Sequence, residues 1–357
     1  MNIDILKVVV PTLFTFLLAI FITPFLTHYL FKYEMWKKRP RHDDSIGGLE
    51  EISPEFKRIQ SNTGEMKTPR PGGIVVWLSF LLSVVIFFVL SRFLTSNGMI
   101  KYNFLSRNQT WLPFFSLMAG SIVGLIDDLL TINSKKGIFA NGFPRKWMIA
   151  IVSLIGLISG LWFYYKLDVS SIHIPFGGTL ELGWLIVPFF LLVFLATFSS
   201  GVIDGIDGLA AGVMGAIFVA FGAIAFFQNQ IDIATFCAAL AGALLAFLWF
   251  NIPPARFYLG ETGMLGLVFT LPIIAFLTNQ ILLLPVIAFI LVITSLSSFI
   301  QIFSKKLRGP IKGKVFRVAP LHHHFEAIGW SREKIVMRYW VISIVFAMVG
   351  VILAMIS

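Results

Sequence analysis

The chain has 357 residues, of which 57% are hydrophobic and only 13% are charged. Soluble domains carry about 25% charged residues, so this composition, with a mean hydropathy of +0.86, excludes a soluble globular protein. The net charge of +10 predicts basic cytoplasmic loops of a membrane protein rather than a nucleic-acid partner. No long polar stretch could fold separately, so residues 1–357 are interpreted as a single integral-membrane domain.

The predicted elements are apolar runs long enough to cross a bilayer as a helix, which takes about 20 residues. The first run exceeds the apolar region of a cleavable signal peptide, and no small-residue cleavage site follows it, so we expect it to remain as a helix. In chain order, the predicted spans cover 8–30, 72–93, 110–126, 147–165, 184–200, 209–227, 231–250, 263–278, 280–304 and 336–356. Between the fourth and fifth spans, residues 167–182 alternate apolar and polar side chains around Gly177-Gly178, which predicts a small β-hairpin outside the bilayer. The fold class is therefore an all-α polytopic membrane protein with about ten transmembrane helices.

Lysine and arginine are distributed unevenly between the two sets of loops. The loops after the odd-numbered spans hold most of them, and the other side holds only Lys7, Arg92, Lys101, Arg107 and Lys166. Basic residues collect on the cytoplasmic side, so both termini and the hairpin are predicted to be periplasmic. The same topology places every unusual polar motif on the cytoplasmic side, which indicates that these motifs form one site.

Two of these motifs are pairs of aspartates. Asp127-Asp128 closes the third predicted span, where ionisable groups are costly and adjacent carboxylates repel each other unless a cation or a proton lies between them. Asp204-Gly-Ile-Asp207-Gly follows the fifth span, and its glycines allow the backbone to approach a ligand closely. The alternatives are a solvated helix end for the first pair and, for Asp207, an N-cap of the next helix.

The remaining motifs carry one acid and several basic groups. Glu261, flanked by glycines at the start of the eighth span, suits Mg²⁺ or a phosphate, although a capped loop is an equal alternative. His322-His323-His324 point in different directions on a helix, so we expect phosphate contacts rather than a zinc site. The turn from Lys67 to Gly73 suits an anion, or is an ordinary basic loop. Together these groups predict metal-assisted phosphoryl transfer between a soluble anion and a lipid.

The stretch from Arg317 to Glu326, Arg-Val-Ala-Pro-Leu-His-His-His-Phe-Glu, resembles the signature of the phospho-N-acetylmuramoyl-pentapeptide transferase (MraY) family. This family belongs to the polyprenyl-phosphate N-acetylhexosamine-1-phosphate transferase superfamily. The Pro-Gly-Gly turn, the two aspartate motifs and Gly-Glu-Thr-Gly also occur in family order over the whole chain. The resemblance implies Mg²⁺-dependent transfer of phospho-MurNAc-pentapeptide from UDP-MurNAc-pentapeptide to undecaprenyl phosphate, which forms lipid I and releases UMP. It further implies a multi-pass protein of the bacterial inner membrane, an active site facing the cytoplasm, and a homodimer.

The resemblance also implies roles for individual residues. The catalytic residues would be Asp127, Asp128, Asp204, His322, His323 and His324, the substrate-binding residues Asp207, Asn251, Tyr258, Lys67 and Gln301, and the metal ligand Glu261. The chain departs from the family at several of these motifs. Glu261 stands where the family has aspartate, Thr131 where it has lysine, Phe198 and Gly201 where it has asparagines, and Arg70-Pro71 where it has Thr-Met.

Two other functions remain open at this point, as does a catalytically inactive scaffold that keeps the same residues. A sibling transferase that uses UDP-GlcNAc would carry the same acids, although the triple histidine argues against it. A membrane transporter would commonly show repeats and charges at the bilayer midplane, whereas this chain shows no repeat and its charges lie at one interface. Direct attack by the lipid phosphate and a two-step route through a phospho-aspartate are both chemically compatible with the residues.

Overall fold

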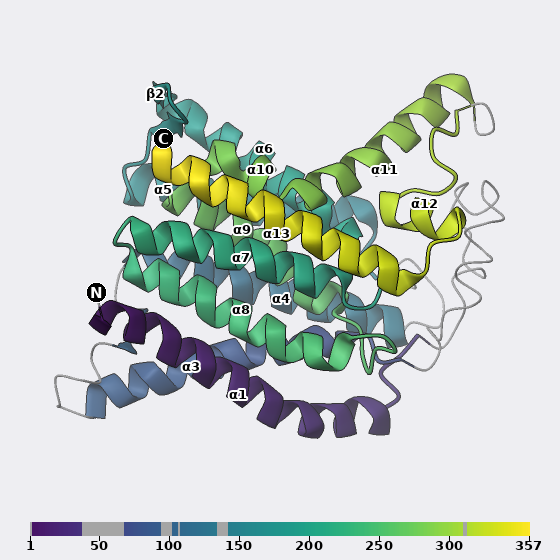
Figure 1. Cartoon of the computed structure of the whole chain (residues 1–357), viewed down its shortest axis with the longest axis horizontal. Coiled ribbons are helices and arrows are strands. Elements are labelled where there is room, and N and C mark those ends of the chain that lie inside the picture. Colours follow the sequence, from purple (N-terminus) through teal and green to yellow (C-terminus); the bar gives the residue numbers. More distant parts are fainter. Residues whose placement is uncertain (1, 38–67, 94–101, 106–107, 134–141, 310–312) are drawn as a thin grey trace.

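The computed structural model describes residues 2–37, 68–93, 102–105, 108–133, 142–309 and 313–357, and it is a bundle of long helices (Figure 1). Within these residues, ten helices are long and apolar enough to cross a membrane, so the all-α polytopic fold is confirmed. The spanning helices are α1 (Asn2–Lys32), α3 (Ile74–Phe93), α4 (Asn108–Asn133), α5 (Arg145–Lys166), α6 (Ile186–Ser199), α7 (Leu209–Phe227), α8 (Ile231–Asn251), α9 (Gly260–Leu277), α11 (Phe289–Arg308) and α13 (Arg332–Ile356). Short helices lie between them, namely η2 (Pro71–Gly73), η4 (Gly183–Leu185), η5 (Ser200–Ile203), η6 (Ile281–Leu283), α10 (Leu284–Ile287) and α12 (Leu321–Ala327).

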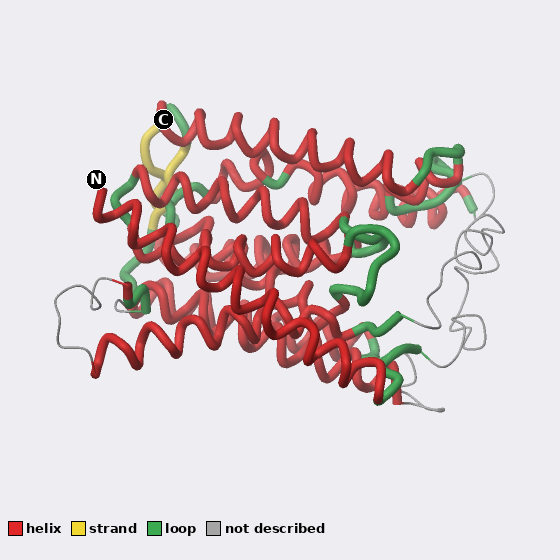
Figure 2. Tube along the Cα trace, turned by 60° about the horizontal axis from the view of Figure 1, so that its bottom comes forward, coloured by secondary structure: helices red, strands yellow, loops and turns green. Residues whose placement is uncertain are grey.

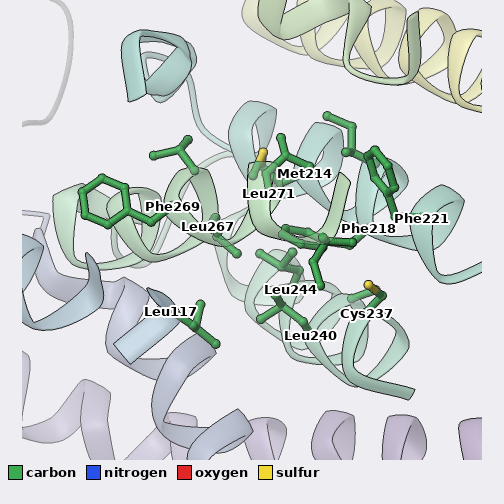
Figure 3. Close-up of a cluster of buried hydrophobic side chains, with 14 of the residues drawn as sticks. Leu117, Met214, Phe218, Phe221, Cys237, Leu240, Leu244, Leu267, Phe269 and Leu271 are labelled. Carbon is green, nitrogen blue, oxygen red and sulfur yellow. The ribbon is translucent and has the colours of Figure 1, made fainter. Parts of the chain in front are cut away.

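Helix α9 lies at the centre of the bundle, and nearly all of its residues are buried. It packs along α4 and also contacts α6, while α7 and α8 pack against each other. Buried side chains from α4, α7, α8 and α9 meet in the cluster of Figure 3, which includes Leu117, Phe218, Leu244 and Phe269. Because lipid is as apolar as these side chains, close packing rather than hydrophobic transfer holds the helices together.

Glycines on α4 permit its close approach to α9. A Cβ atom on Gly120 would lie 2.8 Å from a ring carbon of Phe269, and one on Gly124 would lie 2.7 Å from the backbone nitrogen of Thr262. Any larger side chain would therefore push the two helices apart. This contact matters for the site because α4 and α9 each carry acidic residues of it.

The predicted hairpin is confirmed. Strands β1 (Ser171–Ile174) and β2 (Gly178–Glu181) pair antiparallel, with Ser171 opposite Glu181 and Ile174 opposite Gly178. The hairpin lies at the same end of the bundle as both termini, and α12 lies at the opposite end (Figures 1 and 2). This arrangement agrees with an even number of crossings, and the assignment of the hairpin end to the periplasm stays a prediction.

The ninth predicted span, 280–304, is divided in the structure. After Asn279, which has a positive φ of 54°, the chain forms η6 and α10 before α11 begins at Phe289. Pro285 lies in the first turn of α10, where it needs no backbone hydrogen bond, and Ala288 leaves the helical conformation with a ψ of 32°. Helix α11 leans away from the bundle (Figure 1) and ends with Lys305, Lys306 and Arg308.

Candidate active site

Helix α4 carries the first pair of acids, Asp127 and Asp128. The sequence predicted that the span closes at this pair, but α4 continues to Asn133 because no glycine or proline lies between Asp128 and Asn133. Both side chains are buried, and Asp128 is fully inaccessible. The Phe143 N–H donates to Asp127 Oδ1 over 2.6 Å, and the Thr262 N–H donates to Asp128 Oδ2 over 3.0 Å. Asp128 is therefore tied to the first turn of α9.

The second pair lies on the loop between η5 and α7. Asp204 Oδ2 accepts a hydrogen bond from the Gly260 N–H at 3.1 Å, and Asp207 Oδ2 accepts one from the Ala255 N–H at 3.2 Å. The suggestion that Asp207 caps α7 is wrong, because the N-cap is Gly208, which adopts a φ of +77° and makes no side-chain cap bond. Both aspartates instead hold the segment that leads into α9.

Asn251 is the last residue of α8 and Tyr258 lies in that segment, and both take part in contacts that fix the loops. The buried Asn251 amide accepts from the Gly208 N–H at 2.8 Å and donates to the Phe257 carbonyl at 2.9 Å. The Tyr258 backbone donates to the Pro69 carbonyl and accepts from the Gly72 N–H. Substrate contacts of these two residues stay predictions, and the structure adds a role in holding three loops together.

Gly260 is required where these loops meet. It adopts a φ of +66°, and a Cβ atom there would lie 2.6 Å from Asp128 Oδ2 and 2.5 Å from the Arg70 carbonyl oxygen. Only glycine fits both the conformation and the space. Glu261 follows directly, in the first turn of α9.

The carboxyls of Asp127, Asp128, Asp204 and Glu261 interact electrostatically. The negative charges of Asp128, Asp127 and Asp204 all act on the carboxyl of Glu261, and the one cation in the described residues that acts on all four is Arg70. Its Nε lies 3.8 Å from Asp128 Oδ1, an oxygen that has no hydrogen-bond partner within the described residues. The cluster therefore places four carboxyls beside one cation, and a bound metal ion would favour their charged forms.

Asp204 lies outside the spanning segments, and water reaches its side chain. The protein around its carboxyl still withdraws it from bulk solvent, and this desolvation together with the negative charge of Asp128 raises the pKa of Asp204 to about 7. Asp207 behaves similarly, since desolvation raises its pKa despite the hydrogen bond from Ala255. A cation beside these groups would favour their charged forms.

Helix α12 brings two histidines to the same loop. The Leu321 N–H donates to Ser297 Oγ over 2.9 Å, which joins the start of α12 to α11. A Cβ atom on Gly205 would lie 2.5 Å from His322 Nε2 and 2.9 Å from His323 Nε2, so both rings pack against the loop that carries Asp204. His322 is fully buried, and neither of its ring nitrogens has a hydrogen-bond partner within the described part of the chain.

Burial, aided by His323, keeps the pKa of His322 well below 6.5, so this imidazole is neutral at pH 7. His323 is oriented by Glu326, whose Oε2 lies 2.6 Å from His323 Nδ1, and Arg332 Nε donates to Oε1 of the same carboxyl over 2.6 Å. Burial would raise the pKa of Glu326, but the hydrogen bonds from His323 and Arg332 outweigh it and lower that pKa. Sequence reasoning missed both supporting residues, although spacing of three on a helix could have indicated the His323–Glu326 contact.

His324 differs from its neighbours in the contacts it makes. Its Nδ1 accepts from the Arg317 N–H at 3.2 Å, and its ring packs edge-on against Phe316. Burial, followed by the charge of Arg317, lowers its pKa. A catalytic role for His324 stays a prediction, and its contacts with Phe316 and Arg317 hold the segment that leads into α12.

Gln301 is also engaged with that segment. Its buried amide donates to the Phe316 carbonyl and accepts from the Val315 and Phe316 N–H groups, each over 3.0 Å. A direct substrate contact stays a prediction for Gln301. Lys67, the other predicted substrate ligand, lies outside the described residues.

Replacing Gln301 by methionine is expected to loosen the segment before α12, because the partly buried N–H groups of Val315 and Phe316 lose their acceptor at a cost of up to about 1 kcal/mol each. The measurement is the rate of limited proteolysis within residues 313–320 of the purified protein. Gln301→Glu is the matched variant, since it keeps the acceptor oxygen and, in its protonated form, can still donate to the Phe316 carbonyl, so it should be cleaved more slowly than Gln301→Met. Equal rates for wild type and both variants would refute the clamping role.

Within the described residues, no three histidine, cysteine or acidic side chains converge tightly enough to hold a metal ion by themselves. Mg²⁺ commonly takes only one or two carboxylates and completes its shell with water and substrate phosphate. The unpartnered Oδ1 of the buried Asp128 and the nearby carboxyl of Glu261 fit that kind of site. Asp128 and Glu261 are therefore the candidate ligands.

The chain is similar to known proteins over most of its length. The model of glycosyl transferase family 4 matches residues 110–279, which include both aspartate pairs and Glu261. A phospho-N-acetylmuramoyl-pentapeptide-transferase of Geobacillus thermodenitrificans is 32% identical over 96% of this chain and 97% of its own length. The enzymes of that name from Listeria monocytogenes and Clostridium perfringens are 35% and 38% identical over 80% and 68% of this chain, and over 83% and 75% of their own lengths.

Proposed function

The chain belongs to the phospho-N-acetylmuramoyl-pentapeptide transferase family, and we propose that its site transfers phospho-MurNAc-pentapeptide from a UDP carrier to undecaprenyl phosphate. The products are lipid I and UMP, and the reaction is a step of peptidoglycan synthesis. The observation that carries the proposal is the convergence of the acids of α4, α9 and the 204–207 loop with the histidines of α12 at one end of a membrane bundle. UDP-GlcNAc transferases and transporters are not favoured by the relatives.

In the proposed reaction, an oxygen of undecaprenyl phosphate attacks the sugar-linked phosphorus, a new P–O bond forms, and the P–O bond to UMP breaks. Asp127 orients the attacking phosphate, since its carboxyl is held in place by the Phe143 N–H. The neutral His322 and the His323 ring, which Glu326 orients, present nitrogens at the 204–207 loop that suit phosphate or sugar hydroxyls. Catalysis of this kind consists mainly of positioning and charge stabilisation.

Mg²⁺ dependence forms part of the proposal. Asp128 and Glu261 would hold the ion, which supplies neutralisation of the charge on the diphosphate and on departing UMP. The glutamate at 261 reaches one methylene further than the family's aspartate, so its carboxyl can adjust to the ion from the first turn of α9. Support comes from the gathering of four carboxyls in the cluster and from the unpartnered Asp128 oxygen.

The proposal includes an inner-membrane location with the site on the cytoplasmic side, where the nucleotide sugar is found. It is supported by the positive-inside rule and by the lysine-rich and arginine-rich end of α11. A homodimer is a further expectation from the family. We also propose, on the same grounds, that residues 1–357 form a single transferase domain.

The proposal predicts which donor the purified protein accepts. In detergent with undecaprenyl phosphate and Mg²⁺, UDP-MurNAc-pentapeptide should yield a lipid-linked product. UDP-GlcNAc should yield at least about 10²-fold less, because it lacks the peptide and lactyl groups, and the polar groups of the protein that bind them would stay unpaired. Thin-layer chromatography of radiolabelled sugar checks this result. Comparable product from UDP-GlcNAc would reassign the protein to a sibling activity.

A further inference from the structure

Arg70 lies beside the buried carboxylates, at a position where the family has threonine. Its Nε is 3.8 Å from Asp128 Oδ1, and its side chain is 34% exposed while that of Asp128 is 1% exposed. The guanidinium therefore lies between a fully buried acid and solvent. No other ion pair to Asp128 exists among the described residues, and Arg70 has none with any other acid there.

The backbone of Arg70 is fixed from both sides. Its N–H donates to the Met35 carbonyl just after α1, and its carbonyl accepts from Gly72 in η2, each over 2.9 Å. Gly260 lies against the same carbonyl and leaves no room for a Cβ atom. Because the backbone is fixed at the meeting point of α1, η2 and α9, the side chain has a defined origin above the acids.

Four carboxyls surround a site whose substrates are phosphates, and like charges repel. The positive charge of Arg70 acts on Asp127, Asp128, Asp204 and Glu261 alike. Thr131 lies one turn beyond Asp127 on α4. Its hydroxyl donates a hydrogen bond to the Asp127 backbone carbonyl over 3.0 Å, and its side chain is uncharged. Within the described residues, Arg70 is therefore the fixed cation that can face a phosphate at this cluster.

A guanidinium is suited to that task. It carries five N–H donors in a planar fork, and the contact through Nε leaves the outer nitrogens to bind a second anion in a bidentate manner. The charge of Asp128 attracts the guanidinium toward the acids at 3.8 Å, without a hydrogen bond that would occupy one of its donors.

We propose that Arg70 is a catalytic residue of this chain that binds the phosphoryl group under transfer, with Asp128 as the residue that positions it. The proposal rests on the proposed function and assigns to the 68–73 turn a direct part in the reaction. Arg70 stabilises the charge that develops as the P–O bond to UMP breaks. It therefore contributes to kcat more than to the binding of the nucleotide.

The test compares Arg70→Gln, Arg70→Lys and the control Arg308→Gln, which removes an exposed arginine at the end of α11. We expect Arg70→Gln to lower kcat about 10²–10³-fold, in line with the loss of one oxyanion donor. Arg70→Lys keeps the charge without the fork, so it should recover part of that loss. The KM for the UDP-sugar should change less than about threefold in all three variants, because Arg70 interacts with the phosphoryl group mainly in the transition state.

Wild-type kcat in Arg70→Gln, or equal losses in Arg70→Gln and Arg70→Lys, would overturn the proposal. Thermal unfolding of each variant in detergent identifies a loss that comes from misfolding, because Arg70→Lys and Arg70→Gln would then both unfold below wild type. The activity of the wild type distinguishes failure of the proposed function from failure of the role of Arg70. If wild type makes no lipid product, the proposed function fails, whereas an active wild type with an equally active Arg70→Gln removes only the role of Arg70.

Discussion

Replacing Asp128 by asparagine is expected to lower turnover by about 10³-fold or more, because the change removes both the anchor of Arg70 and a candidate metal ligand. Asparagine has the same shape, and its amide oxygen can still accept the Thr262 N–H that Asp128 accepts at 3.0 Å. The fold should therefore survive while the charge is lost. The measurement is the steady-state rate of UMP release, accompanied by thermal unfolding in detergent.

Asp168→Asn is the matched control for this substitution. Asp168 is exposed beside the hairpin, at the end of the bundle opposite α12, and has a φ of +52°, a conformation that asparagine also tolerates. The control should keep wild-type turnover. Turnover in Asp128→Asn within about tenfold of wild type would contradict a direct part for Asp128 in the reaction.

Replacing Gly124 by alanine is expected to damage stability and activity together. The added methyl would overlap the Glu261 carbonyl and lie 2.7 Å from the Thr262 backbone nitrogen, so α4 and α9 must separate. Overpacking of this kind costs about 1–3 kcal/mol. Because the same turn of α9 holds Asp128 and carries Glu261, a displacement of about 1 Å should also lower turnover about 10²-fold.

Gly215→Ala provides the comparison, since Gly215 lies within α7 and its added Cβ would meet no atom within 4 Å. Alanine there should raise the unfolding temperature slightly, because a helix-interior glycine costs roughly 0.5–1 kcal/mol relative to alanine. The two variants are compared by thermal unfolding and by UMP release. A Gly124→Ala protein as stable and active as Gly215→Ala would show that the α4–α9 contact does not position the site.

The helices and the gathering of the polar motifs were predictable from sequence because both depend on simple periodic rules. Apolar length defines a span, and an alternating count of spans determines which loops share a side. Asp128 and Asp204 could therefore be assigned to one site before their contacts were known. The hairpin around Gly177-Gly178 followed from alternation of its side chains.

Contacts between distant loops were not predictable in the same way. Asn251 was expected to bind substrate, which stays a prediction, and its amide also joins Gly208 to Phe257, a contact that only the fold creates. The departure at Arg70 gave no hint of its carboxylate partner, because Asp128 is on a helix far along the chain. Such pairings depend on the packing of α4 against α9, which no local pattern encodes.

The most direct test of the central claim is the release of UMP from UDP-MurNAc-pentapeptide by purified protein, with and without undecaprenyl phosphate. The site is built to join two phosphates at one cluster of acids and histidines, so UMP and lipid I should form in equal amounts only when both substrates and Mg²⁺ are present. Chelation of the metal should stop both products together. Release of UMP without the lipid phosphate, or lipid I formation that Asp128→Asn leaves unchanged, would contradict the account.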